Sequence, residues 1–222
     1  MCRSSKPVFE KDLKAEEDIA EKYYIPPGLT KKSIVVDGGA YCGQWTKHMM
    51  LTYGCQIFAI EPHYENTFFL RQIFCGCNKP VTIVEAALWD VDGTRHLYVD
   101  DSKYKKNACS MYARFKVKRM ISVITITIKT LMKKYKIDKI DLLKLNVEGS
   151  EVDILTSLDK STAAKIPYIC FAPHDGKIVV KKAHNEMLKH LKSIGYKIQI
   201  HTSKSWGPSF KRVVCIHENT NK

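Results

Sequence analysis

The chain has 222 residues, of which 45% are hydrophobic and 27% are charged, and its formal net charge is +13 at pH 7. This length and composition are typical of one soluble globular domain with a substantial core. No apolar run approaches the roughly 18 residues that cross a bilayer, and residues 1–21 lack the apolar stretch of a signal peptide. By default we therefore expect an intracellular, cytoplasmic protein.

The positive charge is concentrated in two segments. Residues 103–139 contain twelve basic residues and one acidic residue, and residues 177–222 contain ten basic and two acidic. The segments at 33–102 and 140–176 carry a small acidic excess. This asymmetry favours attraction to an anionic partner or surface, with a solvated lysine-rich surface as the alternative.

The eight cysteines form no C-x-x-C pair, so the sequence predicts reduced structural thiols, with a redox or metal role as the alternative.

From the N-terminus, residues 1–32 are predicted to form a polar helical lead-in that is broken at Pro26-Pro27-Gly28. Short apolar runs at 33–37, 56–61 and 81–87 predict strands, and helices are expected between them at 44–53 and 64–74. Strands that alternate with helices of about ten residues are typical of β-α-β units in a mostly parallel sheet.

The alternation breaks after Leu88. A turn at 90–93 lies between 86–89 and 94–99 and predicts an antiparallel hairpin, and the basic stretch at about 100–120 is expected to be a loop insertion. A strand is predicted at 121–128. Further strands are expected at 140–146 and 166–172, helices at 149–158 and 178–194, and a final antiparallel pair at 196–200 and 212–217.

The elements together predict an α/β, Rossmann-like fold. Its mostly parallel seven-stranded sheet has helices on both faces, and the basic insertion follows the third strand. Residues 33–222 would form a single domain after the lead-in.

A glycine-rich turn directly follows the first predicted strand. Its sequence is Val-Asp-Gly-Gly-Ala-Tyr-Cys-Gly at 36–43. Glycines at such a turn let the backbone approach a ligand, and the helix that follows directs unpaired N–H groups toward it. The spacing matches neither the dinucleotide fingerprint nor a phosphate-binding P-loop.

Glu61 ends the second predicted strand, 24 positions after Asp37, and Pro62 follows it. An acidic residue about 20 positions beyond a glycine turn is placed to accept the two hydroxyls of a ribose. The two features together predict an adenosine-containing ligand.

Four segments carry a resemblance to a known family. They are Val-Asp-Gly-Gly-Ala at 36–40, Ile-Glu-Pro at 60–62, Ala-Leu-Trp-Asp-Val-Asp-Gly at 87–93 and Asp-Leu-Leu-Lys-Leu-Asn-Val-Glu-Gly-Ser-Glu at 141–151. In this order they resemble FkbM-type methyltransferases over roughly residues 33–200. The last segment is the most specific, since residues 143–151 depart from the family pattern at one fixed position.

The resemblance implies an S-adenosylmethionine-dependent methyltransferase fold and activity, with S-adenosylhomocysteine as product, and most often O-methylation of a sugar or other small-molecule hydroxyl. By the same resemblance, the cofactor would be held by residues from three strand ends. They are Asp37, Gly38, Gly39, Ala40 and Gly43 in the turn, Glu61 and Pro62 at the ribose, and Ala87 and Leu88 at the adenine.

Catalytic residues are expected at the carboxyl ends of the fourth and fifth strands. Carried over from the family pattern, they are Asn146, Glu148, Lys144 and His174. His174 or Glu148 is the predicted general base. Lys144, between apolar neighbours, has two structural alternatives: it snorkels or it pairs with a carboxylate.

Asn146 replaces the family's usual aspartate. Asn accepts and donates hydrogen bonds but cannot take a proton or add a negative charge. The sequence therefore leaves open a weak or inactive enzyme and also leaves open whether a divalent metal takes part. No metal ligands are predicted.

The acceptor is less well defined than the cofactor. An anionic glycan or other small molecule is expected first and RNA second, and a third alternative is a methyltransferase-like module that binds nucleic acid through its basic face. The basic insertion interleaves cations with aromatic side chains, as a phosphate-binding surface would. Its candidate cations are Lys103, Lys105, Lys106, Arg114, Lys116, Lys118 and Arg119.

Overall fold

A computed structural model of the chain describes residues 24–76, 80–100, 108–112, 119–173, 181–202 and 211–221. Most of the predicted lead-in, most of the basic insertion and His174 lie outside these described residues. Residues 24–32, the described end of the lead-in, form turns and irregular chain rather than helix.

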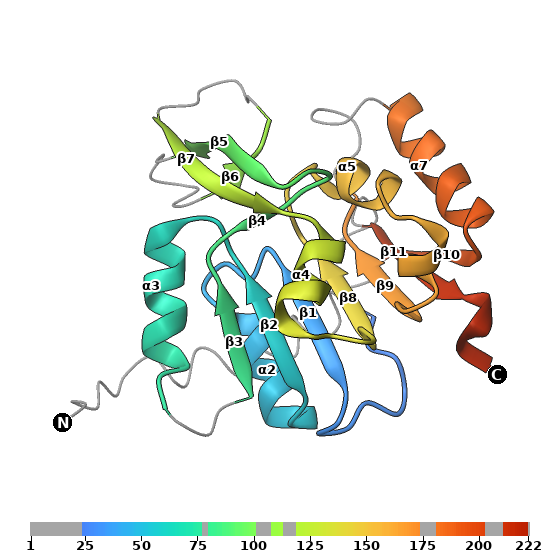
Figure 1. Ribbon diagram of the computed structural model, residues 1–222, viewed down its shortest axis with the longest axis horizontal. Coiled ribbons are helices and arrows are strands. Elements are labelled where there is room, and N and C mark those ends of the chain that lie inside the picture. Colours follow the sequence, from blue (N-terminus) through green and yellow to red (C-terminus); the bar gives the residue numbers. More distant parts are fainter. Residues whose placement is uncertain are drawn as a thin grey trace.

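The main sheet has seven strands in the order β10-β11-β9-β8-β1-β2-β3 (Figure 1). The strands are β1 (Ile34–Gly38), β2 (Gln56–Ile60), β3 (Val81–Val84), β8 (Leu142–Leu145), β9 (Tyr168–Phe171), β10 (Tyr196–Thr202) and β11 (Lys211–His217). Four neighbouring pairs are parallel, whereas β11 runs antiparallel to both β9 and β10. The prediction of seven strands is confirmed, and the sheet is of mixed orientation.

The helices cover both faces of this sheet. They are α2 (Gln44–Tyr53), α3 (Tyr64–Ile73), α4 (Ile128–Tyr135), α5 (Glu151–Thr156), α6 (Lys160–Ala163), α7 (Lys181–Ser193) and the 3-10 helix η1 (Glu218–Asn221). None of the helices in the described ranges has both the length and the apolar character to cross a bilayer.

Side chains alternate between two cores because successive strand residues point to opposite faces. Val36 and Leu143 face the larger core, which α4, α5 and α7 close. Val35 and Leu142 face the opposite core, which is closed by α2. The central strands are therefore buried on both sides, which explains their continuous apolar runs.

A second, four-stranded sheet corrects the predicted hairpin. It contains β4 (Ala87–Leu88), β5 (Gly93–Asp100), β6 (Ala108–Ser110) and β7 (Arg119–Ile126) in the order β4-β7-β5-β6. Ala87 and Gly93 both pair with Thr125, so β4 and β5 lie on opposite sides of β7 rather than against each other. The turn between them is tied to the end of β7, because Thr125 Oγ1 donates to the carbonyl of Val91 at 2.9 Å.

The sequence also missed helix α4. The predicted strand at 121–128 ends at Ile126, because Thr127 caps α4 by accepting a hydrogen bond from the Thr130 N–H at 3.1 Å. Asp92 secures the same corner, since it accepts from Thr127 N at 2.7 Å and Thr130 Oγ1 at 2.6 Å. A capping threonine thus ends the Ile-Thr alternation.

Gly39 is required where β1 meets β8. Its φ is 72°, and a Cβ atom there would overlap the carbonyl oxygen of Asn146. Gly28 has a similar φ of 84°, but nothing lies within 4 Å of the position that a Cβ atom would take there. Both glycines therefore have a positive φ, but only Gly39 has no room for a side chain.

We expect Gly39→Ala to lower the free energy of unfolding by clearly more than Gly28→Ala, which should cost about 1 kcal/mol. Only Gly39→Ala adds a backbone clash to the positive-φ penalty. Urea denaturation of both variants measures the difference. Equal losses of unfolding free energy in the two variants would show that the backbone around Asn146 moves aside easily for a side chain at position 39.

Candidate functional site

The carboxyl ends of the parallel strands meet at one edge of the main sheet. Gly38 pairs with both Ile60 and Leu145, and these pair in turn with Val84 and Phe171. The residues that follow these strand ends therefore gather at the same edge. In open α/β sheets this is the edge that binds ligands.

Asp37 of β1 is buried beneath this edge, and its carboxylate is held by side chains from two other elements, β8 and α2. Lys144 Nζ lies 2.6 Å from Asp37 Oδ1, and Thr46 Oγ1 of α2 donates to Oδ2 at 2.6 Å. Asp37 and Lys144 are register partners on β1 and β8 and are 0% and 3% exposed. Lys144 also donates to the carbonyl of Gly39 at 3.2 Å. Of the two structural alternatives for Lys144, snorkelling or pairing with a carboxylate, the structure shows the pairing.

The glycine turn closes over this ion pair. The N–H groups of Gly39 and Ala40 both donate to the carbonyl of Ile60, at 3.0 and 3.1 Å. Gly43 begins α2 with a φ of 78°, and a side chain there would collide with Leu70 and Phe74. The turn thus packs between α3 and the end of β2, as a close-approach glycine loop does.

Glu61, directly after β2, is buried beside the turn. Its Oε1 accepts from His63 N at 3.0 Å and Asn66 Nδ2 at 3.1 Å, and its Oε2 accepts from Tyr41 N at 2.9 Å. Burial raises the pKa of Glu61 above its ordinary range, although these three donors oppose the shift. The carboxylate is therefore fixed in orientation.

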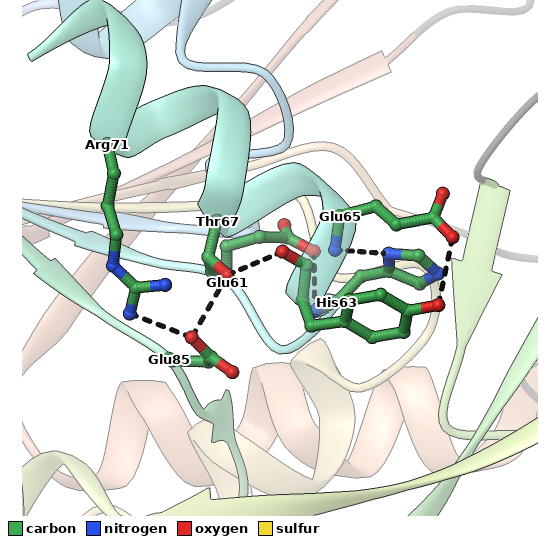
Figure 2. Close-up of polar contacts among 7 residues, drawn as sticks. Glu61, His63, Glu65, Thr67, Arg71 and Glu85 are labelled. Carbon is green, nitrogen blue, oxygen red and sulfur yellow. Dashed lines mark hydrogen bonds and ion pairs between the residues drawn. The ribbon is translucent and has the colours of Figure 1, made fainter.

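Glu85, a residue that the sequence analysis missed, follows β3 at the same edge (Figure 2). Its Oε2 accepts from Thr67 Oγ1 at 3.1 Å and from Arg71 at 2.7 Å, so α3 neutralises it. Its position at a strand end was the only signal in the sequence. Asn66 was also missed; its Oδ1 is buried and has no hydrogen-bond partner among the described residues.

The loop after β8 is held from within by Glu151. The Glu151 carboxylate accepts from Val147 N at 3.3 Å and Gly149 N at 2.9 Å. Within this loop Glu148 has a φ of 55°, a left-handed conformation that is uncommon for a residue with a side chain. Asn146 and Glu148 are half-buried at the carboxyl edge, as predicted from the sequence, and Glu151 is a structural member of the same motif.

The second sheet docks onto this loop. Ser110 Oγ donates to the carbonyl of Glu148 at 2.9 Å, and the Tyr112 hydroxyl donates to Asp153 of α5. Burial, reinforced by this hydrogen bond, raises the pKa of Tyr112, so the hydroxyl remains a donor. The Tyr112 ring also lies 5.9 Å from that of Trp89. The end of β6 and the residues just after it are thereby anchored to the loop that carries Glu148 and to α5.

Ala87 and Leu88 lie elsewhere than predicted. The third strand ends at Val84, and the two residues form β4 of the second sheet. Both are buried, and the Leu88 side chain packs closely over Gly38. Pro62 lies as expected between Glu61 and the helix-capping His63. Of the candidate basic residues, Arg119 is described, and it lies 3.6 Å from Glu65.

The described residues contain no group of three or more His, Cys, Asp or Glu side chains arranged to hold a metal ion. Burial raises the pKa of Cys170 to about 11, which keeps this thiol neutral in the core. A separate cavity of about 400 Å³ lies at the opposite edge of the sheet, where Ser33, Asp141 and Pro167 precede their strands.

Removing one member of the buried ion pair should be costly. We expect Lys144→Met and Asp37→Asn each to lower the free energy of unfolding by about 3–5 kcal/mol, because each leaves a buried group without its partner. The double variant should lose clearly less than the sum of the two single losses. Chemical denaturation of the four proteins gives the coupling energy, and strictly additive losses would contradict a direct pair.

Comparisons with known proteins agree with this arrangement. A model of the methyltransferase FkbM domain matches residues 37–198. A sequence search found no curated protein that matches the chain.

Three solved structures illustrate the shared fold. An FkbM methyltransferase from Methylobacillus flagellatus superposes with a TM-score of 0.57 at 14% identity, over 86% of this chain and 44% of its own. The fibrillarin pre-rRNA processing protein of Methanococcus jannaschii gives 0.55 at 15%, over 90% of this chain and 74% of its own. Aeropyrum pernix fibrillarin, solved with natively bound S-adenosyl-L-methionine, gives 0.51 at 12%, over 86% and 69%.

At these identities the three superpositions show the fold, and the chain spans less than half the length of the Methylobacillus protein. The match to the family model, in contrast, covers most of the chain and contains the glycine turn, Glu61 and the loop after β8. This chain therefore belongs to the FkbM methyltransferase domain family.

Proposed function

We propose that this protein is an S-adenosylmethionine-dependent methyltransferase that methylates a hydroxyl group of a sugar or another small molecule. One observation carries the proposal: a fixed carboxylate, Glu61, lies beside a glycine turn at the carboxyl edge of a family-matched sheet. Residues 33–222 would form the methyltransferase domain.

The residues at this edge fit the cofactor. A ribose presents two adjacent hydroxyl donors, and Glu61 presents carboxylate oxygens whose orientation is fixed by three N–H groups. The buried Oδ1 of Asn66 adds an acceptor beside it. The backbone of the glycine turn would lie along the cofactor, and the Asp37–Lys144 pair would hold the turn in shape.

S-adenosylmethionine supplies an electrophilic methyl group when it is bound. The chain must then place an acceptor hydroxyl at the β8 edge and remove its proton. Glu148 is the described candidate for this base, because its side chain follows β8 and its backbone is fixed by Ser110. His174, which follows β9 in sequence, is the other candidate. We assign Lys144 the supporting role of orienting Asp37.

Asn146 would orient the methionine end of the cofactor through hydrogen bonds, since it cannot act as a base. If an aspartate is needed at this position for proton transfer, the chain would be a weak enzyme.

RNA is the second acceptor class that we propose. The basic excess of residues 103–139, within which β6 and Tyr112 dock beside Glu148, favours this alternative. In that case the basic insertion would contact the phosphates.

The activity is tested by transfer of a labelled methyl group from S-adenosylmethionine to panels of sugars, small-molecule hydroxyl compounds and RNA. We expect incorporation into one panel and a loss of about 10²-fold or more in Glu148→Gln, with binding of S-adenosylhomocysteine unchanged. Full activity of Glu148→Gln together with an inactive His174→Ala would transfer the base role to His174. Absence of transfer to every panel member would contradict the proposed acceptors.

The raised pKa of Glu61 gives cofactor binding a pH dependence. Ribose hydroxyls donate best to the ionised carboxylate, so affinity for S-adenosylhomocysteine should fall as the pH drops through this pKa. The loss should begin above the pH of about 4.3 at which an ordinary glutamate titrates.

Glu61→Gln should bind at least about tenfold more weakly at neutral pH and lack this pH dependence. The half-buried Glu65, which does not contact Glu61, provides the control: Glu65→Gln should keep the pH profile of the wild type. Calorimetry over a pH series measures all three proteins, and an unchanged pH profile in Glu61→Gln would refute the role of Glu61.

A further inference from the structure

The two lysine-rich segments of the sequence each contribute a helix to the same face of the molecule. Helix α4 belongs to residues 103–139 and α7 to residues 177–222. Leu131 of α4 and Leu191 of α7 are buried in the same core cluster, on one side of the main sheet. Figure 1 shows α4, α5 and α7 in front of the sheet. The outer surfaces of α4 and α7 therefore face the same side.

The short helices between them connect α4 to α7. Lys129 of α4 lies 3.6 Å from Asp159, the residue that caps α6. On the other side, His190 Nε2 of α7 lies 2.9 Å from the carbonyl of Leu158, just after α5. Helices α5 and α7 also pack directly against each other. The surface from α4 to α7 is thus continuous.

This surface is strongly basic. Five of the twelve residues at 128–139 are lysine and one is acidic, and α7 has four lysines and one glutamate. We call the exposed lysines the lysine face. They are Lys129, Lys133, Lys134, Lys136, Lys139, Lys182, Lys189 and Lys192.

Three acidic groups along this surface have partners within the chain, and one of them, Asp141, lies 2.8 Å from Lys139. Asp159 accepts from Thr162 N at 2.7 Å and from Ser161 Oγ at 2.6 Å, which holds its pKa well below the usual range. Asp153 accepts from Tyr112. Asp138, in the α4 segment, and Glu186, on α7, are the exposed acids of these two stretches, so lysines clearly outnumber them.

The face lacks the apolar anchors that a membrane surface needs. The large exposed hydrophobic residues of the described chain lie on other elements, and none is on α4, α5, α6 or α7. Helices that lie in a membrane interface present Trp, Phe or Leu beside their lysines. A phosphate backbone, in contrast, requires only closely spaced cations.

We infer that the lysine face binds the phosphate backbone of a nucleic acid, without sequence preference. It is formed by residues other than the basic insertion of residues 103–119. The inference does not rest on the proposed methyl transfer, because binding here requires neither cofactor nor acceptor. The surface would recruit or orient a nucleic acid whichever hydroxyl is methylated.

Fluorescence anisotropy with a 20-nucleotide single-stranded RNA tests the inference in the full-length protein over a salt series. Two double variants each remove two charges from the face, Lys133→Gln/Lys134→Gln on α4 and Lys189→Gln/Lys192→Gln on α7. The matched control is Lys31→Gln/Lys32→Gln, two exposed lysines that precede β1. Thermal unfolding establishes that each variant is folded.

We expect the α4 and α7 variants each to weaken RNA binding at least about fivefold at low salt. Each should also reduce the slope of log affinity against log salt by about 1, because each phosphate contact on a single strand contributes about 0.7. The control should change affinity less than about twofold.

An equal loss in the control would show that net charge, rather than this face, attracts the RNA, and would overturn the inference. So would unchanged binding in either helix variant, or a wild type that binds anionic phospholipid vesicles but not RNA. A separate measurement of S-adenosylhomocysteine binding tests the cofactor proposal, so a failure of that proposal can be distinguished from a failure of the RNA inference.

Discussion

The ion pair between Asp37 and Lys144 is the constraint on which the rest of the site depends. It joins β1 to β8 at register partners, and Thr46 adds α2 to the same carboxylate. Both charges are almost fully removed from water, so the cost of burying them is offset only while the geometry is kept. The pair consequently fixes the position of the residue from which the glycine turn leaves β1. Lys144 also donates a hydrogen bond to the carbonyl of Gly39 in that turn.

Two glutamates at adjacent strand ends differ in their hydrogen-bond and ion-pair partners, and this difference decides which of them suits a ligand. The Glu61 carboxylate is held by the uncharged N–H donors of Tyr41, His63 and Asn66. Glu85 is instead neutralised by Arg71 (Figure 2). A ribose suits the first environment, because its paired hydroxyls need an acceptor and bring no charge. The loop that carries Glu148 lies at the same edge of the sheet. It is held in place by a hydrogen bond from Ser110 of the second sheet.

The sequence predicted the main sheet well because its strands are short, buried runs separated by helices. It failed between Ala87 and Ile128, where the pairing of β4 and β5 is decided by β7, which lies some 30 residues further along the chain. Glu61 was found because a strand end and a spacing identify it. Asn66 carries no such pattern, and Glu85 has only its position at a strand end. Their roles follow from contacts that only the folded chain brings together.

A crystal structure of the protein with S-adenosylhomocysteine tests the central claim most directly. The account predicts that both ribose hydroxyls lie within hydrogen-bond distance of the Glu61 carboxylate, with the ligand against Gly38 and Gly39 at the carboxyl edge. A ligand bound in the cavity at the opposite edge, beside Ser33 and Asp141, would contradict it. So would a ligand at the carboxyl edge whose ribose makes no contact with Glu61.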